Sequence, residues 1–498
     1  MSIHVNILTL KELLEKQLVI PEYQRFYVWD KENVDDLLND LKDFFLNNEN
    51  EEYYLGTVIL HNDKTNKKYN IIDGQQRILT LLIILYVFEQ QKYNIEGKFN
   101  NKITMQNIRN NYKYVKEYLD NNQNNKITLL NNIIFTEIET DSEDEAFIFF
   151  DTQNGRGVTL DAIDYLKSYH LRAIKNDNYR DIIAEDWDKN NKYDKKKKHN
   201  NLNILFNEIL WKARRWTGRN IHYENIKEIK REFEKNTKHN DNDQCLYYTN
   251  IENIMYIDKN ITKDINSLVF NIKEKNIKIK DKKYYPFKIR QPIMEGINFF
   301  LYTNKYNEIY KYLFDNNNEV SDEDADEDEI IKFHKLYTDI YKTNISKYLK
   351  SLFELLCVVY YDKYGEKDLF KFALYCDYLI GNYRILKARI SKETIIKILK
   401  FDIEEKETDN LLDIIQMSFE ADEIIKFIDK ITPKIKENID IKKSGVISKY
   451  IISYSNFIKD SGIDINIIYM KDKKRINYKM DKLKDRKNSI LKIISKGQ

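Results

Sequence analysis

The chain has 498 residues, a length that predicts two or three domains. Its 82 lysine and arginine residues almost balance 80 acidic residues, so any polyanion must be bound by local patches. Three widely separated cysteines argue against a disulfide framework or a zinc knuckle, and no secretion signal or membrane-length apolar run occurs; we therefore expect a soluble, cytoplasmic protein.

The first 75 residues contain a predicted helix, an extended loop and a hairpin. Leucine spacing predicts a short helix over 8–18. Residues 20–29 follow as a loop or edge strand, because a proline keeps the preceding residue extended. Asp30 is the expected N-cap of the next helix. Strands over 56–60 and 69–72, joined by a polar turn, predict a hairpin.

After residue 75 the sequence predicts two helical segments and one more strand, and then mainly helices. A long apolar helix over 78–85 is followed by a polar helical stretch over 91–130 and a strand over 133–138. Ser142 and Glu145 form a predicted capping box. Beyond about residue 180 the apolar period is almost wholly helical. The sequence thus predicts an α+β protein, with an α/β domain over 1–180, a helical domain over 181–385 and a helical region with a basic tail over 386–498.

Asp73-Gly74-Gln75-Gln76-Arg77 stands where a strand turns into a helix. Such a corner offers main-chain N–H groups and the positive end of a helix dipole to a phosphate. Arg77 could clamp phosphate oxygens, and Asp73 could hold a metal-bound water or orient a nucleophile. The alternative is a tight turn with Asp73 as N-cap. The two glutamines favour a ligand, because an unpaired buried amide costs about 1–3 kcal/mol.

A second group of polar and aromatic residues lies earlier, at Tyr23, Gln24, Arg25, Tyr27 and Trp29. Rings can stack on a base, and an arginine can contact a base or a phosphate. The alternative is an edge strand that buries its tyrosines in a core and pairs its arginine with a carboxylate. This segment alone does not decide between the two.

A third group comprises Asn154, Arg156 and Gly157, followed by Asp164 and Lys167. It could form a second loop that contacts phosphate or base. Taken alone it is better explained by a turn and by a pair of opposite charges three residues apart on a helix.

Two further basic segments are candidates for nucleic-acid contact. Residues 211–219 combine tryptophan and arginine, although a helix that buries Trp211 and extends its arginines to solvent explains them better. The tail over 471–498 has a net charge of +8, from 11 basic and 3 acidic residues, and equally fits a solvated terminal helix. No histidine lies in an H-x-x-P or H-x-x-H setting, and no P-loop occurs, so we predict no metal ligands.

Four motifs in a fixed order resemble the N-terminal domain of GmrSD-type modification-dependent restriction systems, which has a ParB/sulfiredoxin-like fold. They are I-P-x-Y-Q-R-x-Y-x-W at 20–29, Y-L-G at 54–56, I-D-G-Q-Q-R-x-x-T-L at 72–81, and F-x-x-x-N-x-x-G at 150–157 with Leu160, Asp164 and Lys167. The resemblance covers about the first third of the chain.

The resemblance implies a domain that hydrolyses a nucleoside triphosphate, GTP or ATP, with Mg²⁺, in defence against phage. It assigns one set of residues to hydrolysis and another to nucleotide binding. The implied catalytic residues are Asp73, Gln76, Arg77, Gln24 and Arg25. The implied nucleotide-binding residues are Tyr23, Gly74, Gln75, Asn154, Arg156 and Lys167.

One departure concerns cleavage. Many relatives carry a C-terminal HNH-type nuclease, whose histidine-containing site we do not find in this sequence. We therefore expect DNA, including modified phage DNA, as a partner, with a separate HNH-type subunit supplying any cleavage; a homo-oligomer is also compatible with the sequence. Two alternatives stay open: a DNA-binding regulator switched by nucleotide without turnover, and a metal-dependent nuclease with a carboxylate-only site.

Overall fold

The chain divides into two compact units in a computed structural model, Met1–Glu185 and Asp186–Gln498, which are described separately as the first and second unit. The expected boundaries at 180 and 385 stay predictions. The structure describes residues 3–21, 24, 26–48, 51–89, 92–97, 102–121, 129–143, 145–147, 149, 162–174, 177–191, 193–194, 199–223, 226–234, 287–315, 327–342, 345–387, 389–401, 410–435, 445–461, 469–472, 475–478 and 486–496.

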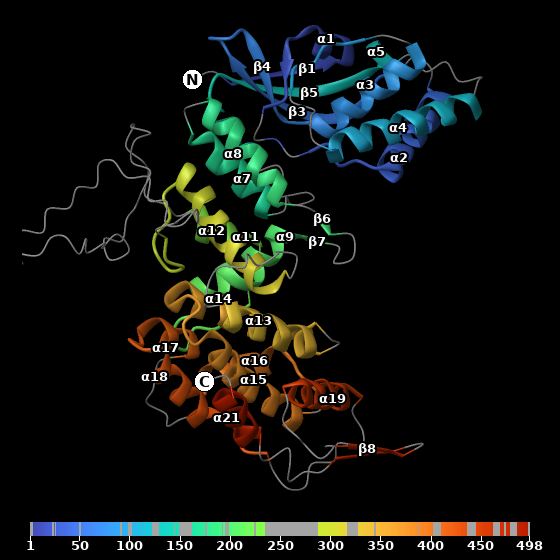
Figure 1. Ribbon diagram of the computed structural model, residues 1–498. Coiled ribbons are helices and arrows are strands. Elements are labelled where there is room, and N and C mark those ends of the chain that lie inside the picture. The colour runs from blue at the N-terminus through green and yellow to red at the C-terminus, as the bar shows by residue number, and fades with distance from the viewer. Residues whose placement is uncertain are drawn as a thin grey trace, which may run out of the picture. The chain divides into compact units, whose positions relative to one another are not determined.

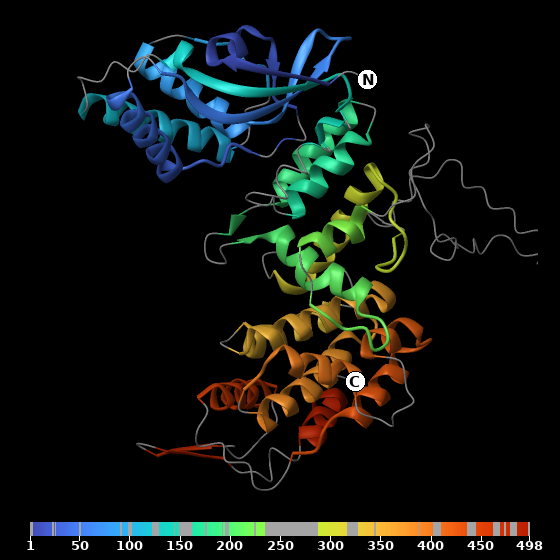
Figure 2. The same cartoon turned by 180° about the vertical axis from the view of Figure 1, so that it is seen from behind.

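A five-stranded sheet organises the first unit, in the order β1-β5-β3-β4-β2. β3 pairs antiparallel with β4 and parallel with β5, and the teal β5 is visible among the blue strands in Figure 2. The predicted hairpin and the strand after residue 133 are confirmed. The strands are β1 (Ile3–Thr9), β2 (Leu18–Val19), β3 (Tyr53–Asp63), β4 (Lys68–Asp73) and β5 (Ile133–Thr140).

The predicted helix over 8–18 is wrong at both ends. Residues 3–9 form β1, and helix α1 covers only Leu10–Glu15. The helix begins there because the Thr9 side chain accepts from the Glu12 N–H while the Glu12 carboxylate accepts from the Thr9 N–H. The backbone is extended again at Lys16, which leads into β2.

Helices complete the first unit, and Asp30 is confirmed as a cap, since its carboxylate accepts from the N–H groups of Glu32 and Asn33. Figure 1 shows α2, α3 and α4 grouped beside the sheet. The helices are α2 (Lys31–Asn47), α3 (Gln75–Glu89), α4 (Lys102–Asn121), α5 (Leu129–Asn132), α7 (Ala162–Arg172) and α8 (Asp177–Asn190), the last of which runs on into the second unit.

The core of the first unit forms around α3, which is apolar on nearly every side, as expected for a buried helix. Ile78, Leu81 and Leu85 are fully buried, in one cluster with Val58 and Leu60 of β3. Because α3 is packed against β3 in this way, the position of its first turn relative to the sheet is fixed. The Asp73–Arg77 corner is therefore held by the core of the first unit.

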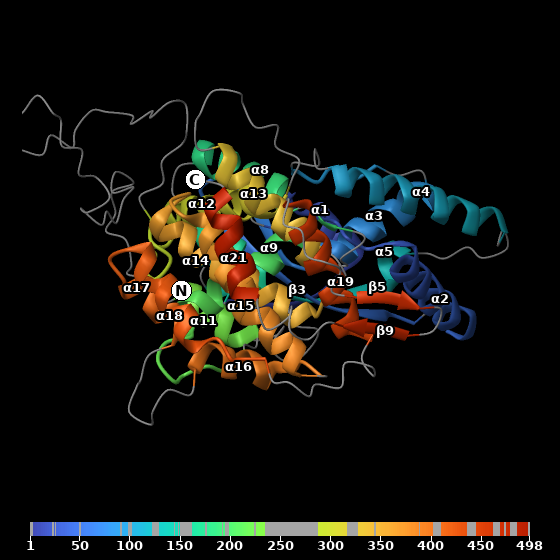
Figure 3. The same cartoon turned by 60° about the horizontal axis from the view of Figure 1, so that its bottom comes forward.

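The second unit is mostly helical, with α15 at its centre between α14, α18 and α21, as Figure 3 shows. Two small antiparallel hairpins, β6–β7 and β8–β9, complete it. Among the described helices of the chain, none is long and apolar enough to cross a bilayer. The elements are β6 (Tyr193–Asp194), β7 (His199–Asn200), α9 (Asn201–Ile204), η1 (Leu205–Leu210), α10 (Trp211–Arg215), α11 (Ile226–Glu234), α12 (Ile297–Phe314), α13 (Glu327–Leu336), η3 (Tyr337–Tyr341), α14 (Lys347–Tyr364), α15 (Leu369–Leu386), α16 (Lys392–Lys400), α17 (Leu411–Met417), α18 (Ala421–Ile431), α19 (Gly445–Asp460), β8 (Tyr469–Asp472), β9 (Arg475–Tyr478) and α21 (Arg486–Lys496).

Each basic segment has one buried arginine, contrary to the expectation, whereas Arg215 and Lys487 are exposed as expected. Trp211 is buried as predicted, but Arg214 does not extend to solvent: its guanidinium donates to the Glu232 carboxylate and to the main-chain carbonyls of Ile289 and Gln291. A buried charge persists when it is paired and hydrogen-bonded in this way. Arg214 is thus part of the interior of the second unit.

The last helix is also anchored by a buried arginine. Arg486 of α21 is fully buried and donates to the Asp377 carboxylate at 2.7 Å, to the side-chain amide oxygen of Asn382 and to the Tyr450 hydroxyl. Burial raises the pKa of Asp377, although Arg486 and the Tyr450 hydroxyl act to lower it. Arg486 is therefore a packing element and leaves the basic tail with one charge fewer for a polyanion.

Candidate active site

The strand-to-helix corner depends on Gly74. β4 ends at Asp73 and α3 begins at Gln75, so Gly74 and not Asp73 precedes the helix, and the Gly74 carbonyl accepts the N–H of Ile78. Gly74 has a φ of +100°, and a Cβ there would lie 2.8 Å from a Val58 methyl group. Only glycine suits this combination of a positive φ and a close neighbour. The first turn of α3 consequently starts directly at the edge of the sheet.

Arg77 lies beside this corner and is held by the main chain of β3. Its guanidinium donates to the carbonyl of Leu55 at 3.0 Å and to that of Thr57 at 2.7 Å. A third, longer contact of 3.4 Å joins it to the Asp73 carboxylate. Because a guanidinium has five N–H donors, these bonds leave some of them for an anion. A full two-pronged clamp on phosphate would have to compete with the two carbonyls.

Gly56 makes room for this arginine. The pairing of β3 with β5 shifts register between Tyr54 and Thr57, which marks a β-bulge. Gly56 lies inside the bulge with a φ of +111°, and a Cβ there would come within 2.5 Å of Arg77 Nη1. On either side of Gly56, the main-chain carbonyls of Leu55 and Thr57 both accept from the guanidinium.

Gln76 uses its whole amide group to hold the 26–29 segment. Its side-chain oxygen accepts the N–H groups of Val28 at 2.9 Å and Trp29 at 3.3 Å, and its NH₂ donates to the Phe26 carbonyl at 2.9 Å. Gln76 therefore needs no ligand to satisfy its buried polar atoms. Gln76 thus gives no support to the expectation that the two glutamines favour a ligand, and its implied catalytic role stays a prediction.

Gln75 is different, although it is the next residue. Its side chain is buried, and its carbonyl oxygen has no hydrogen-bond partner within the described part of the chain. A buried acceptor without a partner costs about 1–3 kcal/mol, so such a group calls for an explanation. An N–H or O–H donor from a ligand would supply one.

Gln24 is hydrogen-bonded to the β4 side of the corner. Its NH₂ donates to the carbonyls of Ile71 and Ile72, at 3.0 and 2.8 Å, just before Asp73. Gln24 thus positions the end of β4. The neighbouring candidates Tyr23 and Arg25 lie outside the described residues.

Side chains of α4, absent from the sequence-based set, complete the attachment of this segment. Tyr27 is fully buried, and its hydroxyl is 2.7 Å from the Thr80 hydroxyl and accepts from the Asn111 amide at 2.9 Å. The Asn107 amide donates to the Tyr27 carbonyl. Burial raises the pKa of Tyr27, so it stays protonated and holds this position. In the sequence, the only feature that could have pointed to Asn107 and Asn111 is the group of asparagines in this polar helix.

Lys167, from α7, lies near the same segment. It is almost fully buried, and its ammonium is 5.1 Å from the centre of the Phe26 ring. Asp164 is in the first turn of the same helix. Asn154 and Arg156 fall outside the described residues. The structure therefore brings four of the predicted residues together around the end of β4, and Lys167 lies against the Phe26 ring of the attached segment; the four are Gln24, Gln75, Gln76 and Arg77.

The described part of this corner offers one free acceptor and spare guanidinium donors to a ligand. Gln75 can accept a hydrogen bond from a base or sugar, and Arg77 has donors left for phosphate. Mg²⁺ at such sites is bound by one or two carboxylates together with the phosphates, so Asp73 would be its protein ligand. In the described ranges no three His, Cys, Asp or Glu side chains come together as a metal site.

Comparisons with known proteins divide the chain at a similar place. Residues 10–171 match the family model described as the GmrSD restriction endonuclease, N-terminal domain. Residues 180–443, more than half of the chain, match the model of a family of unknown function, DUF7834. A search of curated proteins found no match. The chain therefore belongs to this family of unknown function and carries in front of it an N-terminal domain of the GmrSD restriction endonuclease type.

Proposed function

We propose that the first unit binds and hydrolyses a nucleoside triphosphate, GTP or ATP, with Mg²⁺, at the corner between β4 and α3. The chain would couple this hydrolysis to the recognition of DNA, including modified phage DNA, as part of a restriction system. Any DNA cleavage would come from a separate HNH-type subunit. The match of residues 10–171 to a restriction endonuclease domain supports the system, and the geometry of the corner supports the site.

The observation that carries this proposal is the buried side-chain carbonyl of Gln75, for which the described residues supply no hydrogen-bond partner. It stands at the start of α3, where main-chain N–H groups lack partners within the helix and favour an anion. Arg77 adds a cation whose position is fixed by Leu55 and Thr57. A neutral acceptor beside a fixed cation and a helix N-terminus suits a molecule with a polar ring system and phosphates.

Phosphate release by the purified full-length protein tests the proposal. GTP and ATP are each supplied with Mg²⁺, and wild type is compared with Gln75→Leu and with Gln106→Leu, a control on the exposed face of α4. Loss of one ligand hydrogen bond, about 1.4 kcal/mol, lowers kcat/KM about tenfold in Gln75→Leu. The control keeps wild-type activity. Gln75→Leu with unchanged activity, or wild type that releases no phosphate from either nucleotide, would refute hydrolysis at this site.

A second candidate is the DNA-binding regulator that holds a nucleotide without turnover. It is favoured by Arg77, because three of its donors already contact the protein and leave few for a transition state. Nucleotide binding measured by calorimetry, without phosphate release, would identify this case. A salt-sensitive gel shift of DNA that changes with nucleotide would support it further.

A further inference from the structure

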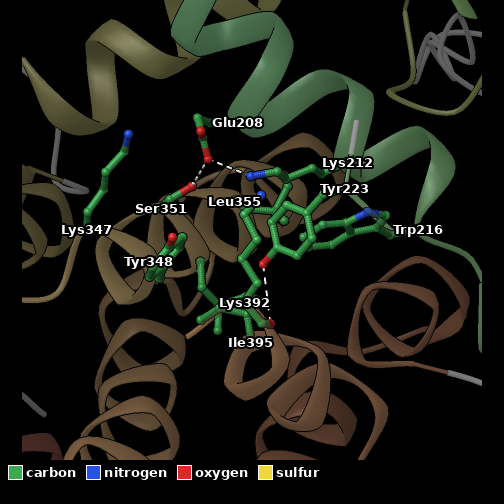
Figure 4. A pocket seen from close by; sticks show the side chains of 11 residues that line it. Glu208, Lys212, Trp216, Tyr223, Lys347, Tyr348, Ser351, Leu355, Lys392 and Ile395 are labelled. Carbon is green, nitrogen blue, oxygen red and sulfur yellow. Dashed lines mark hydrogen bonds and ion pairs between the residues drawn. The ribbon is translucent and has the colours of Figure 1, made fainter. Parts of the chain in front are cut away.

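A polar cavity lies in the second unit, between α14, α16 and the helical stretch η1–α10. It has a volume of about 190 Å³ and is lined by four charged, three aromatic, one hydroxyl and three aliphatic side chains. Figure 4 shows Lys347 and Tyr348 on one side, Tyr223 and Trp216 on the other, and Ser351 and Lys392 between them. No residue of the first unit lines it.

One lysine of the cavity is already neutralised. Lys212 is almost fully buried, and its ammonium donates to the Glu208 carboxylate at 2.5 Å. The same carboxylate accepts from the Ser351 hydroxyl. Burial acts to raise the pKa of Glu208, but its contacts with Lys212 and Ser351 and the charge of Lys347 outweigh it, so this pKa is lowered. The carboxylate therefore stays ionised and balances Lys212.

Two lysines then remain without a carboxylate. Lys347 and Lys392 are exposed, and within the described part of the chain neither forms an ion pair. With three lysines and one glutamate in its lining, the cavity has an excess of two positive charges. Clefts with one sign of charge concentrate ligands of the opposite sign. The charge of this cavity selects an anion.

Aromatic side chains select the rest of the ligand. Trp216 is buried with its ring centre 5.7 Å from that of Tyr223, and the Lys392 ammonium is 4.2 Å from the centre of the Tyr223 ring. Tyr348 stands opposite and is 37% exposed, so one ring is available for stacking. Lysines next to an exposed ring are the combination that binds a phosphate together with a flat base.

We propose that this cavity binds a single nucleotide unit with a phosphate, of the nucleoside monophosphate class. Its volume is below the roughly 300 Å³ at the lower end of pockets that bury most of a drug-sized ligand, so the cavity holds no more than one nucleotide and leaves part of it in solvent. Lys347 and Lys392 contact the phosphate, and Tyr348 stacks on the base. The ligand is a free mononucleotide or the 5′-phosphorylated end of a strand. The proposal does not depend on hydrolysis in the first unit.

Calorimetry on the full-length protein tests this with AMP, GMP, inorganic phosphate and a 5′-phosphorylated oligothymidylate. Lys347→Gln and Lys392→Gln each weaken both AMP and phosphate about threefold, as expected for exposed charges. Tyr348→Ala weakens AMP about tenfold and leaves phosphate unchanged. Lys397→Gln, an exposed lysine on the same helix as Lys392, has no effect. All three cavity side chains are exposed, so these variants are expected to fold.

The outcomes separate the two sites and the two sources of ligand. Tighter binding of the oligonucleotide than of AMP identifies a strand end, and the reverse identifies a free nucleotide. Absence of binding by every probe overturns the proposal. It is equally overturned if the cavity variants leave AMP affinity unchanged while Gln75→Leu abolishes it, because the nucleotide is then bound in the first unit alone.

Discussion

The neighbouring glutamines 75 and 76 should respond in opposite ways to the same substitution. Gln76→Leu removes three hydrogen bonds and leaves the Phe26 carbonyl and the Val28 and Trp29 N–H groups without their partner. At about 1 kcal/mol for each bond, the loss is about 3 kcal/mol. Gln75→Leu removes a buried oxygen that has no hydrogen-bond partner among the described residues, so stability is unchanged or rises by up to about 1 kcal/mol.

Thermal unfolding of the first unit measures this contrast. In a domain of this size each kcal/mol shifts Tm by about 2–4 °C, so Gln76→Leu lowers Tm by about 6–12 °C. Hydrogen exchange of peptides from β4 and α3 assigns the transition to the first unit. Gln106→Leu, at an exposed position of α4, controls for the added apolar side chain. Equal losses in the two variants would show that Gln75 is hydrogen-bonded in the protein and would remove the main support for a ligand there.

The second unit allows two further predictions. Asp377→Asn leaves Arg486 buried without its counter-charge and lowers the free energy of unfolding, measured by chemical denaturation, by about 3 kcal/mol. The control Asp429→Asn breaks an exposed pair with Lys487 and lowers it by less than about 1 kcal/mol. Comparable losses in the two variants would contradict the burial of Arg486. The pKa of Glu208 in the folded state lies below its ordinary 4.5, so the pairing of Glu208 with Lys212 stabilises the unit above pH 4.5 and is lost as the pH falls through the lowered pKa. Glu208→Gln should therefore reduce the loss of stability in acid. A curve of denaturation against pH that is unchanged in this variant would refute the prediction.

Local patterns were sufficient to predict the corner of the first unit. The hairpin, the cap at Asp30 and the apolar helix after Gly74 each follow from a few adjacent residues. β1 was missed because leucines at 10, 13 and 14 suggested a helix over a longer stretch than the Thr9 capping box allows. Boundaries depend on single hydrogen bonds, which hydrophobic spacing does not report.

Side-chain roles at the corner could not be predicted, because their partners are far away in the sequence. Gln76 and Val28 are separated by 48 residues, and Asn111 and Tyr27 by 84. Nothing in the order Gln75-Gln76 indicates which amide meets the 26–29 segment. That choice is made by the orientation of the first turn of α3, which the packing of the whole helix against the sheet determines.

The two candidate sites differ in how their positive charge is held, and this difference separates them experimentally. Arg77 is part-buried and fixed by two main-chain carbonyls, so a nucleotide there would depend mainly on directed hydrogen bonds. Lys347 and Lys392 are exposed on flexible stems, and charges in that setting are screened within a Debye length of about 8 Å at physiological salt. Raising the salt concentration should therefore weaken nucleotide binding to the second unit more than binding to the first. A single salt dependence shared by both would mean that one site, and not two, binds nucleotide.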